Sequence, residues 1–179
     1  SAELKPGELV DKKAEVLGWA KEIHDMLPKE VGNRIISLVK GIKDDNHMLH
    51  GDYHIKNIMV QNGEPFIIDM DTLAMGSPIF ELGFMYSCYS GYQEIDRKNG
   101  LDFFGIEQDI LDKIYIRSLE LYFEGKSKDY IAEVVKKSRI ISYTQLIDRF
   151  IKFNDHADLL ELFKKEIVEL IGEVNDLNL

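Results

Sequence analysis

Two short runs of β-forming residues, joined by a tight turn, constrain the fold of this chain more than any other feature. The runs read NIMV and PFIID, and Asn62-Gly63 lies between them. Asparagine and glycine both tolerate the positive φ angles of a two-residue hairpin turn. The sequence therefore predicts a β-hairpin that brings Asn57, where the first run starts, close to Asp69, where the second run ends.

The rest of the chain has the apolar periodicity of α-helices. Ser77 is a suitable N-cap and Pro78 a suitable first residue for a helix that follows the hairpin. The other predicted helices cover residues 8–27, 31–43, 106–123, 128–153 and 157–175, whereas residues 90–105 are predicted to form a loop. We therefore expect a mainly α fold with a small β-hairpin, in a single domain over residues 1–179.

Composition narrows the classes of partner. Apolar residues make up 45% of the chain, charged residues 30%, and the net charge is -10. Nucleic acids and anionic membranes select basic surfaces, so neither is an expected partner. No apolar run approaches the ~18 residues of a membrane span. The single cysteine, Cys88, cannot form an internal disulfide and is interpreted as a small buried hydrophobic residue, which favours a cytoplasmic location.

The segment HMLHGDYHIKN, which leads into the hairpin, concentrates groups that carry chemistry. His50, Asp52 and Asn57 have the spacing His-x-Asp followed by Asn five residues later, as in the catalytic loop of kinases. Amide and carboxylate oxygens, such as those of Asn57 and Asp69, suit Mg²⁺, which takes further ligands from water and phosphate. Asp52 would then be free to deprotonate a hydroxyl group. The pattern predicts phosphoryl transfer.

HGDYHIKNIMV followed by PFIIDMDTLAMGSPIFELG resembles the aminoglycoside phosphotransferase family, the branch of the protein-kinase-like fold that includes choline, homoserine and fructosamine kinases. The resemblance implies the helical C-terminal lobe of that fold. It also implies an ATP-dependent phosphotransferase, with ATP and Mg²⁺ as cofactors and a hydroxyl group of a small molecule as the phosphate acceptor.

The resemblance also implies roles for individual residues. Asp52 corresponds to the catalytic base, and Asn57 and Asp69 correspond to the magnesium ligands, with Asp71 as a further candidate. His50 would brace the loop through hydrogen bonds. A second histidine, His54, would lie near the transferred phosphate.

Two positions depart from the family pattern. Ser77 and Glu81 stand where the family usually has aspartate, but neither position is a metal ligand, so the reaction class is unaffected. A larger departure is that the 49 residues before His50 read as helix, without a β-rich nucleotide lobe or a glycine-rich loop. We therefore expect a C-terminal lobe without its nucleotide lobe, inactive alone, whose open face could pair with a second copy of the chain.

Two other classes of function compete with the kinase interpretation. His47, His50 and His54, with Asp52, could form the zinc site of a hydrolase. That interpretation leaves the placement of Asn57 at the start of the hairpin unexplained. The other class is a non-catalytic binding or regulatory module derived from a kinase lobe. Metal analysis would distinguish a zinc hydrolase from a kinase. The presence of a nucleotide lobe would distinguish a kinase from a non-catalytic module.

The sequence offers weak indications of the acceptor. The negative net charge favours an amine-bearing acceptor such as an aminoglycoside, an amino sugar or choline, held by acids of the last helices: Asp148, Asp155, Asp158 and Glu161. Such acids are more often a solvated face or helix caps. A stripe of tyrosines could form a box for a cation but is more often core: Tyr86, Tyr89 and Tyr92.

Overall fold

The computed structural model describes residues 9–94, 97–153 and 157–179, except for the side chains of Ala157 and Asp158. It shows a mainly α protein with a small β-hairpin, so the predicted fold class is confirmed. The main helices are α1 (Lys12–Glu22), α2 (Lys29–Lys40), α3 (Ile79–Tyr89), α4 (Asn99–Phe104), α5 (Gln108–Tyr122), α6 (Lys128–Phe153) and α7 (Ala157–Leu170).

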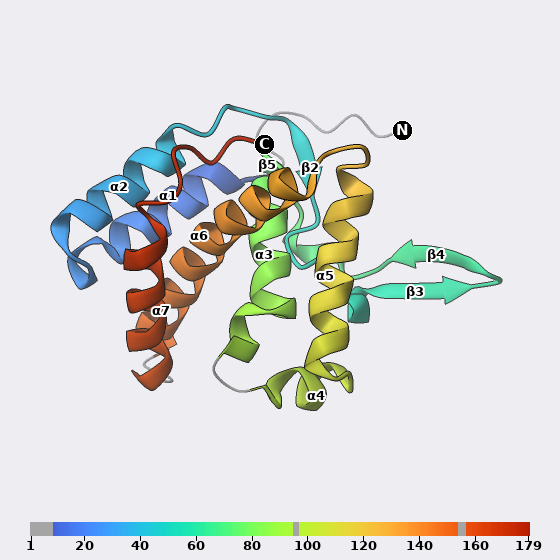
Figure 1. Ribbon diagram of the computed structural model, residues 1–179. Coiled ribbons are helices and arrows are strands. Elements are labelled where there is room, and N and C mark those ends of the chain that lie inside the picture. The colour runs from blue at the N-terminus through green and yellow to red at the C-terminus, as the bar shows by residue number, and fades with distance from the viewer. Residues whose placement is uncertain (1–8, 95–96, 154–156) are drawn as a thin grey trace.

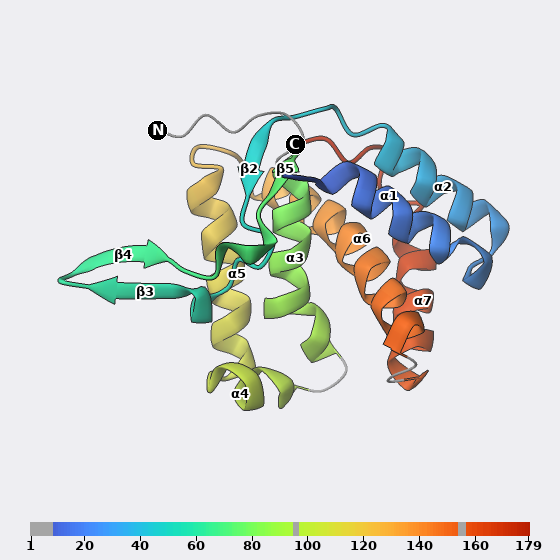
Figure 2. The same cartoon turned by 180° about the vertical axis from the view of Figure 1, so that it is seen from behind.

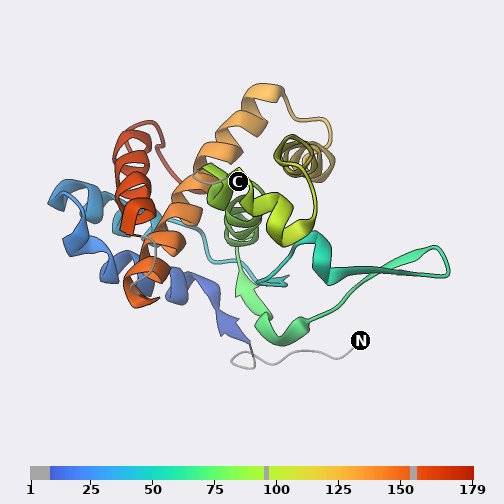
Figure 3. The same cartoon turned by 90° about the horizontal axis from the view of Figure 1, so that it is seen from below.

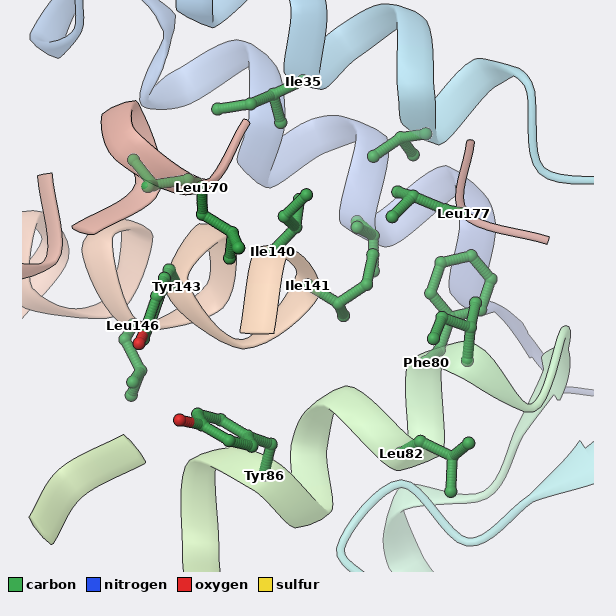
Figure 4. Close-up of a cluster of buried hydrophobic side chains, with 14 of the residues drawn as sticks. Ile35, Phe80, Leu82, Tyr86, Ile140, Ile141, Tyr143, Leu146, Leu170 and Leu177 are labelled. Carbon is green, nitrogen blue, oxygen red and sulfur yellow. The ribbon is translucent and has the colours of Figure 1, made fainter. Parts of the chain in front are cut away.

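Helices α3 and α6 form the centre of the molecule. Helix α5 packs against one side of α3, and α1 and α7 pack against α6, with α2 next to α1 (Figure 1). Side chains from these helices make one continuous core, in which Tyr86 of α3 faces Tyr143 of α6 with ring centroids 6.2 Å apart (Figure 4). The central pair is close because Gly83 has no side chain: a Cβ there would lie 2.5 Å from Ile141 Cγ2.

The predicted hairpin is present. Strands β3 (Ile58–Gln61) and β4 (Glu64–Ile67) are antiparallel, and the turn residues Asn62 and Gly63 have φ angles of 55° and 84°. The hairpin projects from the helical body beyond α5 (Figures 1 and 3). Its apolar side chains, including Val60, are exposed to solvent.

A second, three-stranded sheet was not predicted. Its strands β1 (Val10–Asp11), β5 (Ala74–Gly76) and β2 (His47–Leu49) are ordered β1-β5-β2, with β1 parallel and β2 antiparallel to β5 (Figure 2). Strands of two and three residues are too short to produce a pattern of alternating hydrophobicity. Their pairing depends on contacts between distant segments, and it sets the position of the residues just after β2.

The predicted boundaries of three helices are wrong. The first helix begins at Lys12 and not near residue 8, because Asp11 is in extended conformation and caps it, accepting a hydrogen bond from Ala14 N at 3.0 Å. This helix ends at Glu22, and a 3₁₀ turn, η1 (His24–Met26), follows. Residues 29–40 and 157–170 are helical, in place of the predicted 31–43 and 157–175.

Residues 90–105 are not simply a loop, as the sequence indicated. They contain a 3₁₀ helix, η4 (Gly91–Glu94), and the short helix α4. Tertiary contacts support α4 despite its weak intrinsic propensity, since Phe104 stacks on Tyr89 with ring centroids 5.7 Å apart. Gly100 fits tightly against Leu111, where a Cβ would approach to 2.5 Å. This helix closes one side of the candidate site.

Candidate active site

The loop after β2 is held in place by hydrogen bonds that involve both ring nitrogens and the backbone carbonyl of His50. The Nε2 atom of His50 lies 2.9 Å from the carbonyl oxygen of Ile68, and its Nδ1 atom accepts a hydrogen bond from Asp52 N at 3.2 Å. The hydroxyl of Thr72 donates to the His50 carbonyl at 2.8 Å. His50 therefore ties the loop to the segment that follows the hairpin, which carries Asp69.

Gly51 adopts a conformation that a side chain would prevent. Its φ angle is 81°, and a Cβ would lie 2.2 Å from the carbonyl oxygen of Thr72. Its backbone N–H donates to Glu81 Oε2 at 3.0 Å. Glu81, at the start of α3, thus braces the loop from the helical side.

Asp52 is half-buried and has two polar neighbours from its own loop. The side-chain amide of Asn57 donates from Nδ2 to the Asp52 carbonyl at 2.9 Å and to its carboxylate at 3.1 Å. On the other carboxylate oxygen, His54 Nε2 lies 3.4 Å away. The His54 ring is buried against the edges of Phe103 and Phe104. Asp52 is therefore oriented from two sides.

The base of the hairpin brings Asn57 and the Asp69 segment together. Ile58 pairs with Ile67, and one step beyond that pair Ile68 N donates to the Asn57 carbonyl at 2.9 Å. Asp69 comes next in the chain, in the left-handed region with φ 62°. Asp69 and Asp71 are exposed. Two oxygen-bearing side chains predicted as ligands, Asn57 and Asp69, thus flank the end of one hairpin.

Asp52 lies between two pockets. The larger, of about 640 Å³, is bounded by the loop, by α3 and α4, and by α6. The smaller, of about 390 Å³, is bounded by α1, by Asp71 and Thr72, and again by α3 and α6. Asp52, Phe84 and Gln145 border both. Sequence reasoning did not find Phe84 or Gln145, because they come from helices that only the tertiary fold brings to the loop.

Two residues that line the larger pocket each carry a buried polar atom with no hydrogen-bond partner among the described residues. His54 Nδ1 and Gln93 Oε1 are both buried and unpaired, and both residues line this pocket. Leaving a buried polar group unpaired costs about 1–3 kcal/mol. A bound ligand or water that supplies hydrogen-bonding groups here would recover that cost, as expected for a binding pocket.

Two acids of the last helices that the structure describes, Asp148 and Glu161, line neither pocket. Asp148 is buried and pairs with Lys152 at 3.0 Å, and Glu161 pairs with Lys164 at 2.8 Å on the surface. Asp155 and the side chain of Asp158 lie outside the described residues. The acidic pocket suggested by the sequence is therefore not formed by Asp148 and Glu161.

The tyrosine stripe is mainly core, as the sequence favoured. Tyr86 is buried among Tyr115 and Tyr143 and donates a hydrogen bond to Glu94. Tyr89 is buried against Phe104. Tyr92 alone of the three borders the larger pocket.

Cys88 also borders the larger pocket, but it is not suited to act as a nucleophile. Desolvation raises the pKa of its thiol above the ordinary range, and the nearby charges of Asp52 and Glu81 raise it further. The thiolate is the reactive form of cysteine. Cys88 therefore behaves as an apolar wall residue.

The three histidines of the loop do not converge. His47 is exposed and pairs with Asp45, whereas the contacts of His50 and His54 are directed to Ile68 and to Asp52. Among the described residues, no group of three or more His, Cys, Asp and Glu side chains is arranged to hold a metal ion. The histidine arrangement that a zinc hydrolase would need is not formed in this part of the chain.

Within the described ranges, no helix combines the length and apolar character required to cross a bilayer.

Comparison with known proteins agrees with this geometry. The sequence model of the phosphotransferase enzyme family (APH) matches residues 3–112, more than half of the 179 residues. The matched region contains the His50–Asn57 loop, the hairpin, β5 and α3. No curated protein sequence and no solved structure matches the chain. The family match shows that this chain belongs to the phosphotransferase enzyme family.

Proposed function

We propose that this chain carries the catalytic loop and the acceptor site of an ATP-dependent small-molecule kinase, which transfers the γ-phosphate to a hydroxyl group. The observation that carries the proposal is the position of Asp52. Its carboxylate is oriented by His54 and Asn57 at the boundary of two pockets, on a loop that His50 ties to the Asp69 segment. A general base needs this combination of fixed orientation and access to ligands.

Asp52 would accept the proton of the acceptor hydroxyl as its oxygen attacks the γ-phosphorus. The bond from phosphorus to the bridging oxygen of ADP breaks, and ADP leaves with the electron pair. His54, 3.4 Å from Asp52, would hold the carboxylate in position next to the acceptor. The larger pocket is the proposed acceptor site because it contains both Asp52 and His54.

The side chains at the hairpin base suit Mg²⁺. Asn57 uses its Nδ2 atom for Asp52, which leaves its oxygen Oδ1 available as a ligand. Asp69 offers carboxylate oxygens close to it in the hairpin, and Asp71 is a further candidate. Magnesium typically takes only one or two protein carboxylates, with the remainder of its ligands from water and phosphates. When bound, the ion would neutralise charge on the ATP phosphates.

We further propose that a nucleotide lobe covers the face around the hairpin. Met59, Val60 and Phe66 expose 47%, 69% and 41% of their surface there. Exposed apolar side chains that lie together on a surface tend to mark a contact with another part of the protein, a ligand or a partner. In the absence of such a lobe, the described residues would bind ATP weakly, and a second copy of the chain could cover the same face.

Replacement of Asp52 tests the proposal. In a protein that contains this chain together with its nucleotide lobe, Asp52→Asn should lower kcat by about 10²–10⁴-fold, the usual contribution of a general base. The affinity for ATP should remain nearly unchanged, because Asp52 acts on the acceptor. Steady-state kinetics and nucleotide binding are the measurements.

Asp109→Asn is the matched control for Asp52→Asn. Asp109 lies on α5 and pairs with Lys113 on the surface, at 3.0 Å. This variant should keep the parental kcat. If Asp52→Asn also keeps it, Asp52 is not the base. If the parent shows no phosphoryl transfer with any acceptor, the chain belongs to a non-catalytic module.

A further inference from the structure

The larger pocket beside Asp52 has an unusual lining for an acceptor that carries positive charge. Six of its fourteen lining residues are phenylalanine or tyrosine, including Phe84, Tyr92 and Phe103. Among the described lining residues, the acidic one is Asp52. Its carboxylate is already in contact with Asn57 and His54. Apart from His54, the other ionisable side chain with a basic group among these described lining residues is Arg149, which carries a guanidinium.

Arg149 lies on the face of α6 that lines the larger pocket. Gln145, Arg149 and Phe153 are spaced by four residues on α6, so they share one face of the helix, and all three line the pocket. Gln145 also borders the smaller pocket, together with Asp52. Arg149 is one turn farther along, about 6 Å at 1.5 Å per residue. Arg149 is therefore farther along α6 than Gln145, which borders both pockets together with Asp52.

Arg149 is an exposed residue that lines the pocket, and its charge is not neutralised by a described acid. Its guanidinium lies over the ring of Phe153, 5.4 Å from the centroid. It makes no salt bridge with the residues of 9–94, 97–153 and 157–179. Its field also reaches the pocket wall, since it lowers the pKa of Tyr92 and Cys88 against the raising effect of burial.

Two side chains of the pocket wall, Gln93 and His54, keep hydrogen-bonding atoms that no described residue uses. Gln93 Oε1 and His54 Nδ1 are buried without a partner. Gln93 is held by a hydrogen bond from its Nε2 atom to the Cys88 carbonyl at 3.0 Å, so its oxygen is fixed in place. Together with the aromatic surface, these atoms suit a compound with hydroxyl groups on an apolar or aromatic body.

We propose that the phosphate acceptor is a hydroxyl-bearing small molecule with an apolar or aromatic body and an anionic group, and that Arg149 binds the anion. This inference rests on the proposed function, since it concerns the acceptor of that reaction. The hydroxyl lies at Asp52, the body lies against the aromatic wall, and a carboxylate or similar group meets the guanidinium. An amine at that end would be repelled by Arg149. The proposal therefore replaces the amine-bearing acceptor, which the net charge favoured, by an acceptor with an anionic group.

Three compounds with one body and different charges test this proposal. They are 4-(hydroxymethyl)benzoate, 4-(hydroxymethyl)benzamide and 4-(aminomethyl)benzyl alcohol, whose para-substituted ring separates the hydroxyl from the charged group. Titration calorimetry with the 179-residue chain should show the benzoate binding at least about 10-fold more tightly than the amide, as a charge-assisted hydrogen bond predicts. The amine should bind most weakly.

Two arginine variants make the assignment specific. Arg149→Gln should bring the benzoate and the amide to within about 2-fold of each other by removing the charge-assisted contact, and Arg149→Lys should keep part of the preference. Arg117→Gln is the matched control, because Arg117 lies on the surface of α5 and pairs with Glu120 at 2.9 Å. It should keep the full preference. Circular dichroism should confirm that each variant is folded.

The binding and transfer measurements separate failure of this inference from failure of the proposed function. Equal binding of the three compounds, no binding of any of them, tighter binding of the amine, or an unchanged preference in Arg149→Gln would each overturn the inference. If the preference is present but no phosphate is transferred when the nucleotide lobe is included, the anion site stands and the proposed kinase function fails. If transfer occurs without the preference, the kinase function stands and the anion site fails.

Discussion

At the scale of single residues, the candidate site depends on backbone conformations that few residues can adopt. Gly51 and Asp69 both have positive φ, at 81° and 62°. Aspartate, the residue at position 69, is one of the few residue types that tolerate the left-handed region of backbone conformation. Gly51 is in addition confined by the carbonyl oxygen of Thr72. The Asp52 carboxylate is positioned by this turn as well as by its hydrogen bonds.

Gly51→Ala should therefore be strongly destabilising. The left-handed conformation costs a residue with a Cβ roughly 1–2 kcal/mol, and a contact of 2.2 Å with backbone forces a further shift. We expect the free energy of unfolding to fall by about 3 kcal/mol, as strain and overpacking combine. Urea denaturation measures this change.

Gly125→Ala is the control that isolates the contact. Gly125 has a φ angle of 84°, close to that of Gly51, but nothing lies within 4 Å of the Cβ that alanine would add. Its cost should be that of the conformation alone, roughly 1–2 kcal/mol. Equal losses in the two variants would show that Thr72 does not confine the loop.

At the scale of elements, α6 serves the core and the site from different faces. The face with Gln145 and Arg149 borders the larger pocket, whereas Asp148 is buried on another side, only 4% exposed. Asp148 pairs with Lys152 through one oxygen, and its other oxygen is buried without a partner. Burial raises the pKa of Asp148, the nearby Glu22 adds to the rise, and Lys152 opposes it.

The raised pKa of Asp148 predicts a pH dependence of stability. The folded state holds the Asp148 proton to higher pH than the unfolded state, so this contribution is fully present below the ordinary pKa near 3.8 and is lost as pH rises through the folded value. An asparagine side chain cannot titrate. The stability of Asp148→Asn relative to the parent should therefore increase as pH is raised from ~4 to ~7. Urea denaturation across this range measures it.

The sign of this change separates burial from ion pairing. Asp109, which is exposed, has its pKa lowered by a hydrogen bond from Lys113. Its stabilisation is present above the ordinary pKa and is lost at acidic pH. Asp109→Asn should therefore lose relative stability as pH rises. The same direction of change in both variants would contradict the assigned cause for Asp148.

At the scale of the whole molecule, the close pairing of α3 and α6 holds the two walls of the pocket together. Gly83→Ala would insert a Cβ 2.5 Å from Ile141 Cγ2 in this contact. Overpacking of this kind costs typically ~1–3 kcal/mol. Thermal or urea unfolding should show that loss. In contrast, Gly18→Ala on α1, where nothing lies within 4 Å, should stabilise by roughly 0.5–1 kcal/mol.

A double variant tests whether Ile141 is the cause. Ile141→Ala alone leaves a cavity and should cost ~2–5 kcal/mol. In Gly83→Ala with Ile141→Ala, the new methyl group occupies part of that space, so the combined loss should be smaller than the sum of the single losses. Strictly additive losses would show that the two helices adjust elsewhere.

Local sequence determined those features that depend on neighbours in the chain. Asn62-Gly63 specified the hairpin because both residues accept positive φ, and apolar periodicity specified α2, α5 and α6 within a few residues. Pro78 indicated the start of α3 to within one residue. The spacing of His50, Asp52 and Asn57 specified the reaction class, which the family match supports. Each of these signals is complete within a short stretch of consecutive residues.

Tertiary structure decided what depends on distant segments. Strands β1, β5 and β2 are too short to be recognised singly, and α4 exists because Phe104 and Gly100 pack against Tyr89 and Leu111. Net charge favoured a cationic acceptor, yet the charge of a whole chain does not tell which charges face a pocket. A pocket is formed by side chains that are remote in sequence. Only the packing of α3, α4 and α6 around the Asp52 loop therefore placed Arg149 in the wall of the larger pocket and buried Asp148 on another side of α6.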